Sequence, residues 1–526
     1  MNQSTASSAP APDCLVSLIT CTFNRRAVLG DAVRCAVRQT HRNLQYIIIN
    51  DGGEDVADLV EPFGDPRIVL VQNARNQGKA ACLNQALALA RGKYVAYLDD
   101  DDILYPDHVS SLVAALEGPT DCRVAFSDLY RTTCRRLADG KRVALGKYLE
   151  IIRDFDREFL FHFNHVLHVS LMHRRDLLEK TGLYNETVKV LIDWDMTRRL
   201  AFFSDFLHVR RVTGEYTIPD ADSDRISNRM RKDRSEYDRH VLTIRTTRPP
   251  KPWPMVKDTS IFFLPDRMSL PAADSLARIW KDTFVPYQVL LPLPAEQLET
   301  LDTTAMPNLV RVPVSADLPL TARLDACLRR CEGDCVALVP LGTPIHELWL
   351  EMPRHALIHN PKPDLGYFLA GPGHPEIPPA VLRKEELAAA RLANPALNAR
   401  ESLREAGIQF FRPTLAECPF AFDEILHTAQ DVEKEGDWGK AAEIFGKLPG
   451  KFANELWMKE KQAMAMYRTG SGMEEAARLC REINEQRPTV ESLLLEAKLC
   501  RENDRLPEAA ALLESARQRL LWKGEP

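Results

Sequence analysis

Four consecutive acids, Asp99-Asp100-Asp101-Asp102, are the residues of this sequence best suited to chemistry. They directly follow residues 94–98, an apolar run of the kind that forms a buried strand. A run of charges usually belongs to a solvated surface, but like charges held at the end of a buried strand repel one another. An oxygen-seeking divalent cation relieves that repulsion, and two carboxylates together with phosphate oxygens suit Mg²⁺ or Mn²⁺. The cluster therefore predicts a site for a metal ion and a diphosphate.

The elements around the cluster are expected to place it at one edge of a parallel sheet. Short apolar runs at residues 15–20, 46–49 and 68–71 are typical of strands that are buried on both faces. Between the first two runs, apolar residues recur every three or four positions, as in a helix that packs one face on a sheet. This alternation predicts an open, Rossmann-like, mostly parallel α/β sheet with its ligand at the carboxyl ends of the strands.

Composition excludes several other classes of protein. The 526 residues include 68 Lys and Arg against 74 Asp and Glu, and this mild acidity argues against a nucleic-acid partner. No apolar run approaches the ~20 residues that span a bilayer, so no membrane-spanning segment is expected. Residues 1–13 are rich in Ser, Ala and Pro, which predicts a disordered tail and not a signal peptide. The 12 scattered cysteines are interpreted as reduced thiols, so a cytoplasmic location is expected.

Residues 246–258 form a proline-rich linker. The chain after this linker repeats the strand and helix pattern of the first half, with weaker similarity in sequence. Residues 335–339 match the strand-like run at 94–98, but Pro340-Leu341-Gly342-Thr343 follows where the first half has its four acids. Residues 259–422 are therefore predicted to be a degenerate copy of the first domain. The alternative is that the two α/β domains are unrelated and only share a similar alternation of strands and helices.

The last part of the chain, residues 423–526, is expected to be entirely helical. Alanine pairs that begin at Ala441, Ala476 and Ala509 are separated by 35 and then 33 residues. This spacing resembles the period of about 34 residues in tetratricopeptide repeats. Stacked helical repeats usually present a concave face to a peptide or a protein. A protein partner that binds through this region is therefore expected.

The order of motifs in the first domain resembles that of the family 2 glycosyltransferases of the GT-A fold. The first strand runs into Thr22-Phe23-Asn24-Arg25, where the family typically has Thr-Tyr-Asn-Arg. The second ends in Asn50-Asp51-Gly52-Gly53, which is similar to Asp-Asp-Gly-Ser, and Asn76-Gln77-Gly78 and the acidic cluster follow in the family's order. The resemblance covers residues 14–245. It implies an inverting transferase that uses a nucleotide-diphosphate sugar as its donor.

The resemblance also implies roles for individual residues. Asp51 would face the nucleotide base, and Phe23 could stack on that base. Considered alone, Asp51 would be a turn residue before two glycines. Asp99 and Asp101 would hold Mn²⁺ or Mg²⁺. The implied donor site as a whole comprises Thr22, Phe23, Arg25, Asp51, Lys79, Asp99 and Asp100.

Inverting transfer needs one base, because the nucleoside diphosphate leaves as a stable anion, whereas a glycosidase usually needs a second carboxyl group. The resemblance places this base at Asp193, since Ile192-Asp193-Trp194 is similar to a Glu-Asp-Trp element of the family. Ile192 replaces the first acid, so Asp193 is the sole match and Asp195 is a possible substitute. A helix N-cap is the alternative role for Asp193. Trp194 and His165 are expected to contact the acceptor.

The sequence therefore predicts a metal-dependent glycosyltransferase of three domains, residues 14–245, 259–422 and 423–526. The donor would be a nucleotide sugar, with uridine favoured, and the acceptor a hydroxyl of a glycan, a lipid-linked saccharide or a protein. A non-catalytic scaffold that acts through its helical repeats and a sugar nucleotidyltransferase are the alternative functions.

Alternating apolar residues between 161 and 169 suggest strand-like packing. The polar residues 220–232 are either a lid over the diphosphate or a solvated loop.

Overall fold

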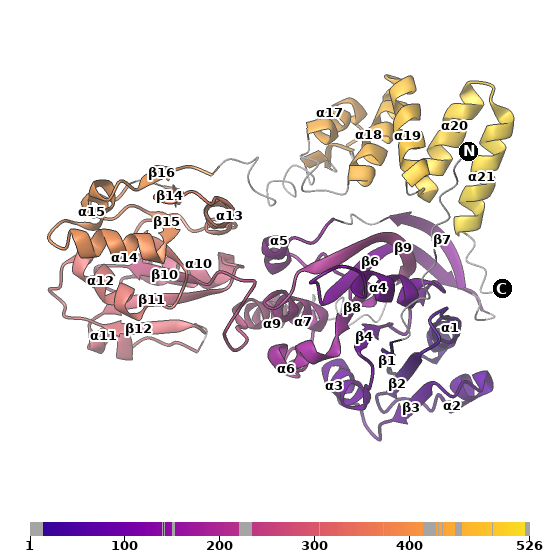
Figure 1. Cartoon of the computed structure of the whole chain (residues 1–526), viewed down its shortest axis with the longest axis horizontal. Coiled ribbons are helices and arrows are strands. Elements are labelled where there is room, and N and C mark those ends of the chain that lie inside the picture. The colour runs from indigo at the N-terminus through magenta and orange to yellow at the C-terminus, as the bar shows by residue number, and fades with distance from the viewer. Residues whose placement is uncertain are drawn as a thin grey trace. The chain divides into compact units, whose positions relative to one another are not determined.

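The computed structural model describes residues 14–138, 140, 142–149, 153–219, 234–304, 306–371, 373–413, 428–429, 431–433, 435–447, 455–486 and 488–520. The chain divides into two compact units (Figure 1). Unit 1 comprises Met1–Asp156, Asn164–Arg234 and Phe422–Pro526, and unit 2 comprises Arg157–Phe163 and Ser235–Ala421. Residues 157–163, which were expected in the first domain, thus belong to the second unit.

Unit 1 contains a sheet in the order β3-β2-β1-β4-β8-β6-β9-β5, with β7 paired to β6. The first four strands, β1 (Val16–Thr22), β2 (Leu44–Asn50), β3 (Ile68–Gln72) and β4 (Tyr94–Tyr97), pair in parallel. Every residue of β2 and β4 is buried, because both faces of this half of the sheet are covered. The strands expected from the apolar runs are therefore confirmed.

The other half of this sheet is mixed. Strand β8 (Leu171–Arg174) is antiparallel to β4 and to β6 (Val124–Arg136), and β9 (Phe206–Pro219) is parallel to β6. Two further strands are β5 (Ile103–Leu104) and β7 (Arg142–Leu149).

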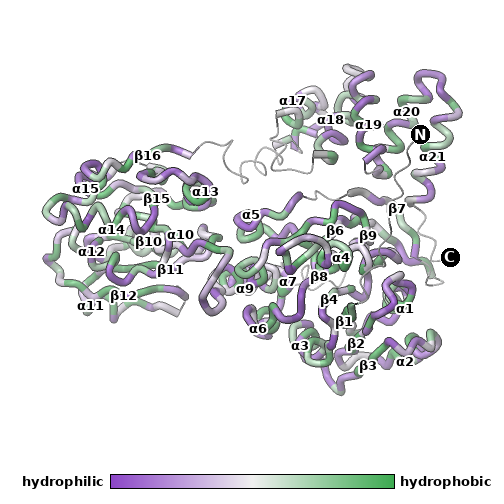
Figure 2. Tube along the Cα trace, in the orientation of Figure 1, coloured by the Kyte–Doolittle hydropathy of each residue, from purple (hydrophilic) through white to green (hydrophobic). Residues whose placement is uncertain are grey.

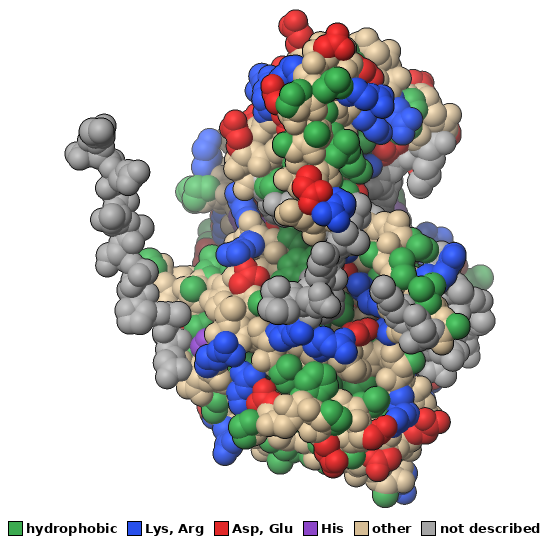
Figure 3. Space-filling model, turned by 90° about the vertical axis from the view of Figure 1, so that its right-hand side faces the viewer, with side chains coloured by type: hydrophobic (Ala, Val, Ile, Leu, Met, Phe, Trp, Pro, Cys, Tyr) green, Lys and Arg blue, Asp and Glu red, His purple; other side chains and the backbone are tan. Residues whose placement is uncertain are grey.

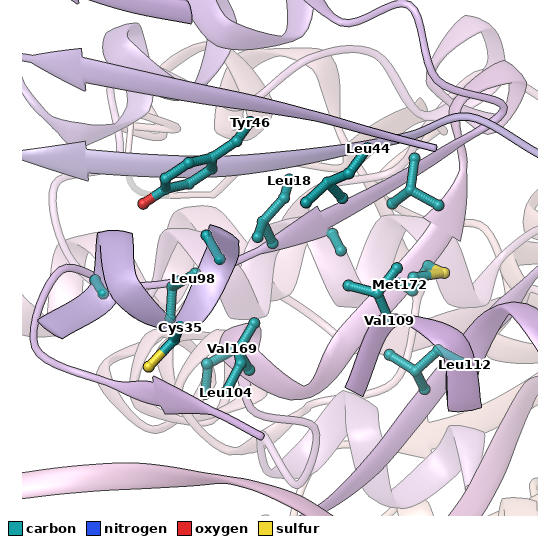
Figure 4. Close-up of a cluster of buried hydrophobic side chains, with 14 of the residues drawn as sticks. Leu18, Cys35, Leu44, Tyr46, Leu98, Leu104, Val109, Leu112, Val169 and Met172 are labelled. Carbon is teal, nitrogen blue, oxygen red and sulfur yellow. The ribbon is translucent and has the colours of Figure 1, made fainter. Parts of the chain in front are cut away.

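The helices of the α/β part of unit 1 cover its sheet. They are α1 (Arg26–Val37), α2 (Ala57–Val60), α3 (Lys79–Leu89), α4 (His108–Leu116), α6 (Leu178–Thr181) and α7 (Ile192–Ala201). Figure 4 shows one core cluster, in which Tyr46 and Leu44 from the sheet lie above Cys35 of α1 and Val109 of α4, respectively. This burial of apolar side chains fixes the strand ends that carry the polar residues.

Unit 2 contains a sheet in the order β12-β11-β10-β13-β15-β14-β16. Its strands are β10 (Thr259–Leu264), β11 (Tyr287–Leu293), β12 (Leu309–Pro313), β13 (Cys335–Pro340), β14 (Leu365–Phe368), β15 (Ala380–Arg383) and β16 (Gln409–Phe411). The first four pair in parallel, β15 is antiparallel to β13 and β14, and β16 is parallel to β14. This order and these directions reproduce β3-β2-β1-β4-β8-β6-β9 of unit 1 strand by strand.

The two sheets also share one buried polar cluster, made of a serine on the first strand, a glutamine on the second and a glycine before the fourth. Its members are Ser17, Gln45 and Gly92 in unit 1 and Ser260, Gln288 and Gly333 in unit 2. The glycine amide donates to the serine hydroxyl at 2.9 Å in unit 1 and 3.0 Å in unit 2. A Cβ atom on the glycine would lie 2.5 or 2.6 Å from the serine backbone nitrogen, so only glycine fits at either position.

The helices of unit 2 are α5 (Arg157–His162), α9 (Arg234–Thr246), α10 (Leu270–Asp282), α11 (Ala295–Glu299), α12 (Leu320–Arg330), α13 (Glu351–His359), α14 (Lys384–Ala393) and α15 (Ala399–Glu405). The strand-like packing expected between residues 161 and 169 is wrong. Residues in this stretch form the end of α5 and a short 3-10 helix, η2 (His168–Ser170).

The carboxyl-terminal segment is helical, as expected. Its helices are α17 (Trp438–Lys447), α18 (Glu455–Thr469), α19 (Met473–Gln486), α20 (Val490–Glu502) and α21 (Leu506–Leu520). Hydrophobic and hydrophilic residues alternate along them (Figure 2), and consecutive helices pack on one another. Ala441, Ala476 and Ala509 are all buried, which is consistent with close approach of neighbouring helices.

Charges of both signs are interspersed on the face shown in Figure 3, in keeping with the small formal net charge of −6. In the part of the chain that the structure describes, no helix combines the length and the apolar character needed to cross a bilayer. The cysteines on which the structure reports are free thiols.

Candidate active site

The acidic cluster lies at the carboxyl end of β4, beside the end of its parallel neighbour β1. The Thr22 hydroxyl donates to Asp100 Oδ2 at 2.7 Å. Arg25 bridges two of the acids, because its Nη1 donates to Asp100 Oδ1 at 2.6 Å and its Nη2 to Asp101 Oδ2 at 2.5 Å. The repulsion expected among these carboxylates is therefore relieved in part by an arginine of the chain itself.

Asp99 pairs with a different cation. Lys79 Nζ donates to Asp99 Oδ1 at 2.8 Å, and His168 Nδ1 lies 4.0 Å from the same oxygen. Burial alone would raise the pKa of Asp99, but Lys79 and His168 outweigh it and hold that pKa well below its usual range. The His168 ring stacks on Tyr97 with centroids 4.0 Å apart, and its Nε2 shares a hydrogen bond with the Tyr184 hydroxyl at 2.8 Å. His168 is thus a site residue that the sequence analysis did not assign.

The two central acids of the cluster have different environments from the fourth. Burial raises the pKa of Asp100 to about 7, with the Arg25 charge opposing the rise and Asp101 adding to it. Asp102 is itself buried, and its Oδ1 accepts the backbone amide of Thr217 on β9 at 2.8 Å. The fourth acid therefore fixes β9 to the end of β4.

Asp51 holds a loop. Its two carboxylate oxygens accept the backbone amides of Gln77 at 2.8 Å and Gly78 at 2.9 Å, and the residue is only 4% exposed. Gly78 has φ 95° and directly precedes α3, so these hydrogen bonds set the start of the helix whose first residue is Lys79. Contact between Asp51 and a nucleotide base stays a prediction. Phe23, at the end of β1, is 42% exposed and available for stacking.

Asp193 lies in the first turn of α7. Leu191, with φ 57°, occupies the N-cap position and Ile192 begins the helix, so the alternative in which Asp193 is the N-cap is wrong. Asn164 Nδ2 donates to Asp193 Oδ2 at 3.0 Å. Burial would lower the pKa of Lys79, but Asp99 and, more weakly, Asp193 raise it. Asp193 and the acidic cluster thus act electrostatically on the same lysine.

The structure separates the other residues expected near the acceptor. Trp194 is only 4% exposed and lies under the Arg198 guanidinium, 5.4 Å from its ring centroid, so the expectation that a sugar stacks on this indole is corrected. Asp195 is 1% exposed and paired with Arg199 at 2.6 Å, which makes it unsuited to replace Asp193 as a base. His165 lies among aromatic rings beside Asn164. Its contact with an acceptor stays a prediction.

The donor atoms at the end of β4 fit a hard divalent cation, since they are carboxylate oxygens. Among the described residues, however, no three His, Cys, Asp or Glu side chains are grouped so as to hold a metal alone. Asp99 and Asp101 therefore fit a cation whose remaining ligands come from a diphosphate and water. The expected lid, residues 220–232, lies outside the described residues.

A parallel sheet with acids and bases gathered at its carboxyl edge is typical of nucleotide-binding α/β enzymes. Comparison with known families gives a more specific class, because residues 17–181 match the family model described as Glycosyl transferase family 2. Residues 17–181 of unit 1 are therefore similar to the family 2 glycosyltransferases, as the motifs indicated.

Curated relatives agree with this class. An uncharacterised glycosyltransferase of Methanocaldococcus jannaschii, MJ1057, is 28% identical over 216 residues, which cover 40% of this chain and 72% of that protein. An uncharacterised glycosyltransferase of Haemophilus influenzae is 36% identical over 141 residues, 26% of this chain and 38% of the relative. The Escherichia coli UDP-Glc:alpha-D-GlcNAc-diphosphoundecaprenol beta-1,3-glucosyltransferase WfaP is 33% identical over 104 residues, 20% of this chain and 41% of WfaP. The chain thus spans less than half of the last two proteins.

Solved structures with some likeness include Staphylococcus aureus TarS 1-349, with 15% identity, a TM-score of 0.34 and coverage of 44% of this chain and 64% of TarS 1-349. Another is the mannosyltransferase PcManGT of Pyrobaculum calidifontis in complex with GDP-Man and Mn²⁺, with 19% identity, a TM-score of 0.33 and coverage of 45% and 66%. The similarity of unit 1 to this family rests on the sequence match and not on these structures.

Proposed function

We propose that the chain is a metal-dependent, inverting glycosyltransferase that moves a sugar from a nucleotide-diphosphate sugar to a hydroxyl acceptor. The observation that carries the proposal is the arrangement around Lys79 within the family 2 domain. This lysine pairs with Asp99 at 2.8 Å, and its pKa responds to the charge of Asp193 on another element. This arrangement supports a single site that would combine donor-binding groups with a separate carboxylate base.

In the donor site, Asp99 and Asp101 would hold Mn²⁺ or Mg²⁺, and the cation would neutralise charge on the leaving diphosphate. Arg25 and Lys79 now pair with these same carboxylates. Both side chains are partly exposed, at 41% and 31%, and can turn toward the diphosphate once the acids are otherwise neutralised. The four residues would then act as one set of charges around the phosphates.

Asp193 would remove the proton of the acceptor hydroxyl as that oxygen attacks the sugar. One of its oxygens, Oδ2, is held by Asn164, which orients the carboxylate. A well-placed general base contributes about 100- to 10,000-fold to a rate. No acid is needed for the leaving group, so a single carboxylate outside the donor site suffices.

UDP-sugars are the favoured donors, and a lipid-linked saccharide is the favoured acceptor. WfaP, by its name, uses UDP-Glc and a diphosphoundecaprenol-linked saccharide, and it shares its similar region with this domain. A hydroxyl on another glycan or on a protein would suit the same chemistry. The exposed Phe23 is the candidate for stacking on the nucleotide base.

Unit 2 is proposed to be a copy of the donor domain that has lost its chemistry. Its sheet repeats the strand order of unit 1, but Pro294 follows β11 where Asp51 follows β2, and the stretch from Pro340 to Thr343 replaces the acids. The helices between residues 428 and 520 are proposed to be tetratricopeptide-like and to bind a protein partner. A cytoplasmic location is proposed because buried free thiols suit a reducing compartment.

Two variants test the function. Asp101→Ala is expected to abolish Mn²⁺-dependent binding of UDP in calorimetry, whereas Glu179→Ala, an exposed acid on α6, leaves binding unchanged. Asp193→Asn is expected to keep UDP affinity and to lose at least about 100-fold in transfer to a saccharide acceptor. Binding of UDP that does not depend on Mn²⁺ would contradict the metal site. Normal turnover of Asp193→Asn would place the base elsewhere.

A further inference from the structure

Helix α5 belongs to unit 2 although the segments directly before and after it, up to Asp156 and from Asn164, belong to unit 1. Glu158 on this helix forms an ion pair with Arg354 of α13, and the two side chains are 6% and 0% exposed. Arg354 also donates to the Thr259 hydroxyl at 2.8 Å and to the Lys257 carbonyl. A fully buried guanidinium therefore ties α5 to the start of the first strand of unit 2.

Apolar and aromatic contacts hold the same helix. Phe159 is 3% exposed and packs with Leu348 and Met352. The His162 ring lies edge-on to Phe284, with centroids 4.3 Å apart and an interplanar angle of 81°. Both ends of this short helix are thus anchored by side chains of unit 2.

The chain passes from unit 2 to unit 1 immediately after α5, between Phe163 and Asn164. The Phe163 amide still donates to the Phe159 carbonyl at 2.7 Å, so helical hydrogen bonding continues up to the junction. The next residue, Asn164, donates to Asp193 Oδ2 at 3.0 Å. One peptide bond therefore separates a segment held by unit 2 from the side chain that orients Asp193.

We propose that unit 2 positions Asp193 for transfer through α5, with Asn164 and Glu158 as positioning residues. The proposal rests on the proposed function of Asp193. Neither residue takes part in the chemistry. Asn164 fixes one oxygen of the carboxylate, and the Glu158–Arg354 pair fixes the backbone from which Asn164 projects. A copy of the donor domain without donor chemistry would thereby contribute to catalysis by holding a few residues of the active one.

Kinetics of three variants test this coupling. Asn164→Ala is expected to lower kcat by about tenfold or more, because small displacements of a catalytic group are costly, with the donor KM unchanged. Glu158→Gln should lower kcat by a smaller factor and should also leave the donor KM unchanged. The double variant should be no slower than Asn164→Ala alone, because both changes act through one hydrogen bond.

Asp325→Asn is the matched control. It breaks a bidentate ion pair with Arg391 at 2.8 and 2.9 Å, which joins α12 to α14 within unit 2 and does not involve α5. This variant is expected to keep the wild-type kcat and donor KM. An equal loss of kcat in Asp325→Asn, or strictly additive losses in Glu158→Gln/Asn164→Ala, would overturn the proposal, because either result means a general effect of unit 2 stability.

Hydrogen exchange gives a readout that needs no activity. Glu158→Gln, and not Asp325→Asn, should speed exchange in residues 157–165 and also in the first turn of α7 around Asp193. Faster exchange confined to residues 157–163 would overturn the coupling even in an active enzyme. If the wild-type protein transfers no sugar but this exchange pattern is found, the proposed function fails and the mechanical link stands.

Discussion

Substitution of Gly92 by alanine tests the packing that fixes the start of β4. The added Cβ would lie 2.5 Å from the Ser17 backbone nitrogen and 2.6 Å from the Tyr94 carbonyl oxygen, and neither backbone atom can rotate away. The strand must shift and the hydrogen bond from Gly92 to the Ser17 hydroxyl is weakened. Overpacking costs about 1–3 kcal/mol and a lost buried hydrogen bond about 1 kcal/mol, so we expect unit 1 to lose about 2–4 kcal/mol.

Native-state hydrogen exchange is the suitable assay, because a chain of two compact units has no single unfolding free energy. In Gly92→Ala, the slowest amides of β1 and β4 should exchange about 30- to 700-fold faster. Gly333→Ala should do the same to β10 and β13 and leave the slowest amides of β1 and β4 unaffected. Gly30→Ala is the control, since nothing lies within 4 Å of its added Cβ and the helix should gain about 0.5–1 kcal/mol. Unchanged exchange in Gly92→Ala would refute the packing argument.

Three further predictions concern charge and backbone strain. Lys79→Met removes the cation that pairs with Asp99 and is expected to weaken UDP binding about tenfold in calorimetry, whereas Lys93→Met breaks a partly exposed ion pair with Glu117 and should change it less than about twofold. Burial raises the pKa of Glu491 from 4.5 to about 8, so its stabilising contribution is complete below pH 4.5 and is lost as the pH rises through about 8. Exchange in α20, corrected for pH, should therefore accelerate between about pH 4.5 and pH 8 in the wild type and much less in Glu491→Gln. Leu191→Gly relaxes a φ of 57° and should slow exchange in α7, by an amount equivalent to about 1 kcal/mol.

The sheets could be predicted from the sequence because their central strands are buried on both faces. Every residue of β2 is buried, so its apolar run is visible without any knowledge of its neighbours. The same holds for β13, and the predicted correspondence of residues 335–339 with 94–98 agrees with their equivalent places in the two sheet orders. The location of the acidic cluster followed from the strand that precedes it.

Other parts of the site could not be predicted, since they depend on contacts between distant residues. His168 approaches Asp99 only through the pairing of β8 with β4, which no local pattern indicates. Trp194 is buried although a sugar-binding role suggested exposure. The residues from Glu158 to Phe161 are all buried, so α5 lacks the periodic polar face by which a surface helix is found.

The serine, glutamine and glycine cluster common to both sheets suggests a route to engineering. Ser260, Gln288 and Gly333 join the central strands of unit 2 by hydrogen bonds, as their counterparts do in unit 1. The two sheets should therefore accept each other's connecting loops. Grafting the segment after β4 onto the end of β13, together with the turn after β1, would test whether unit 2 can acquire affinity for a nucleotide. Unit 2 would then be a second scaffold in which nucleotide binding could be designed without any change to the sequence of unit 1.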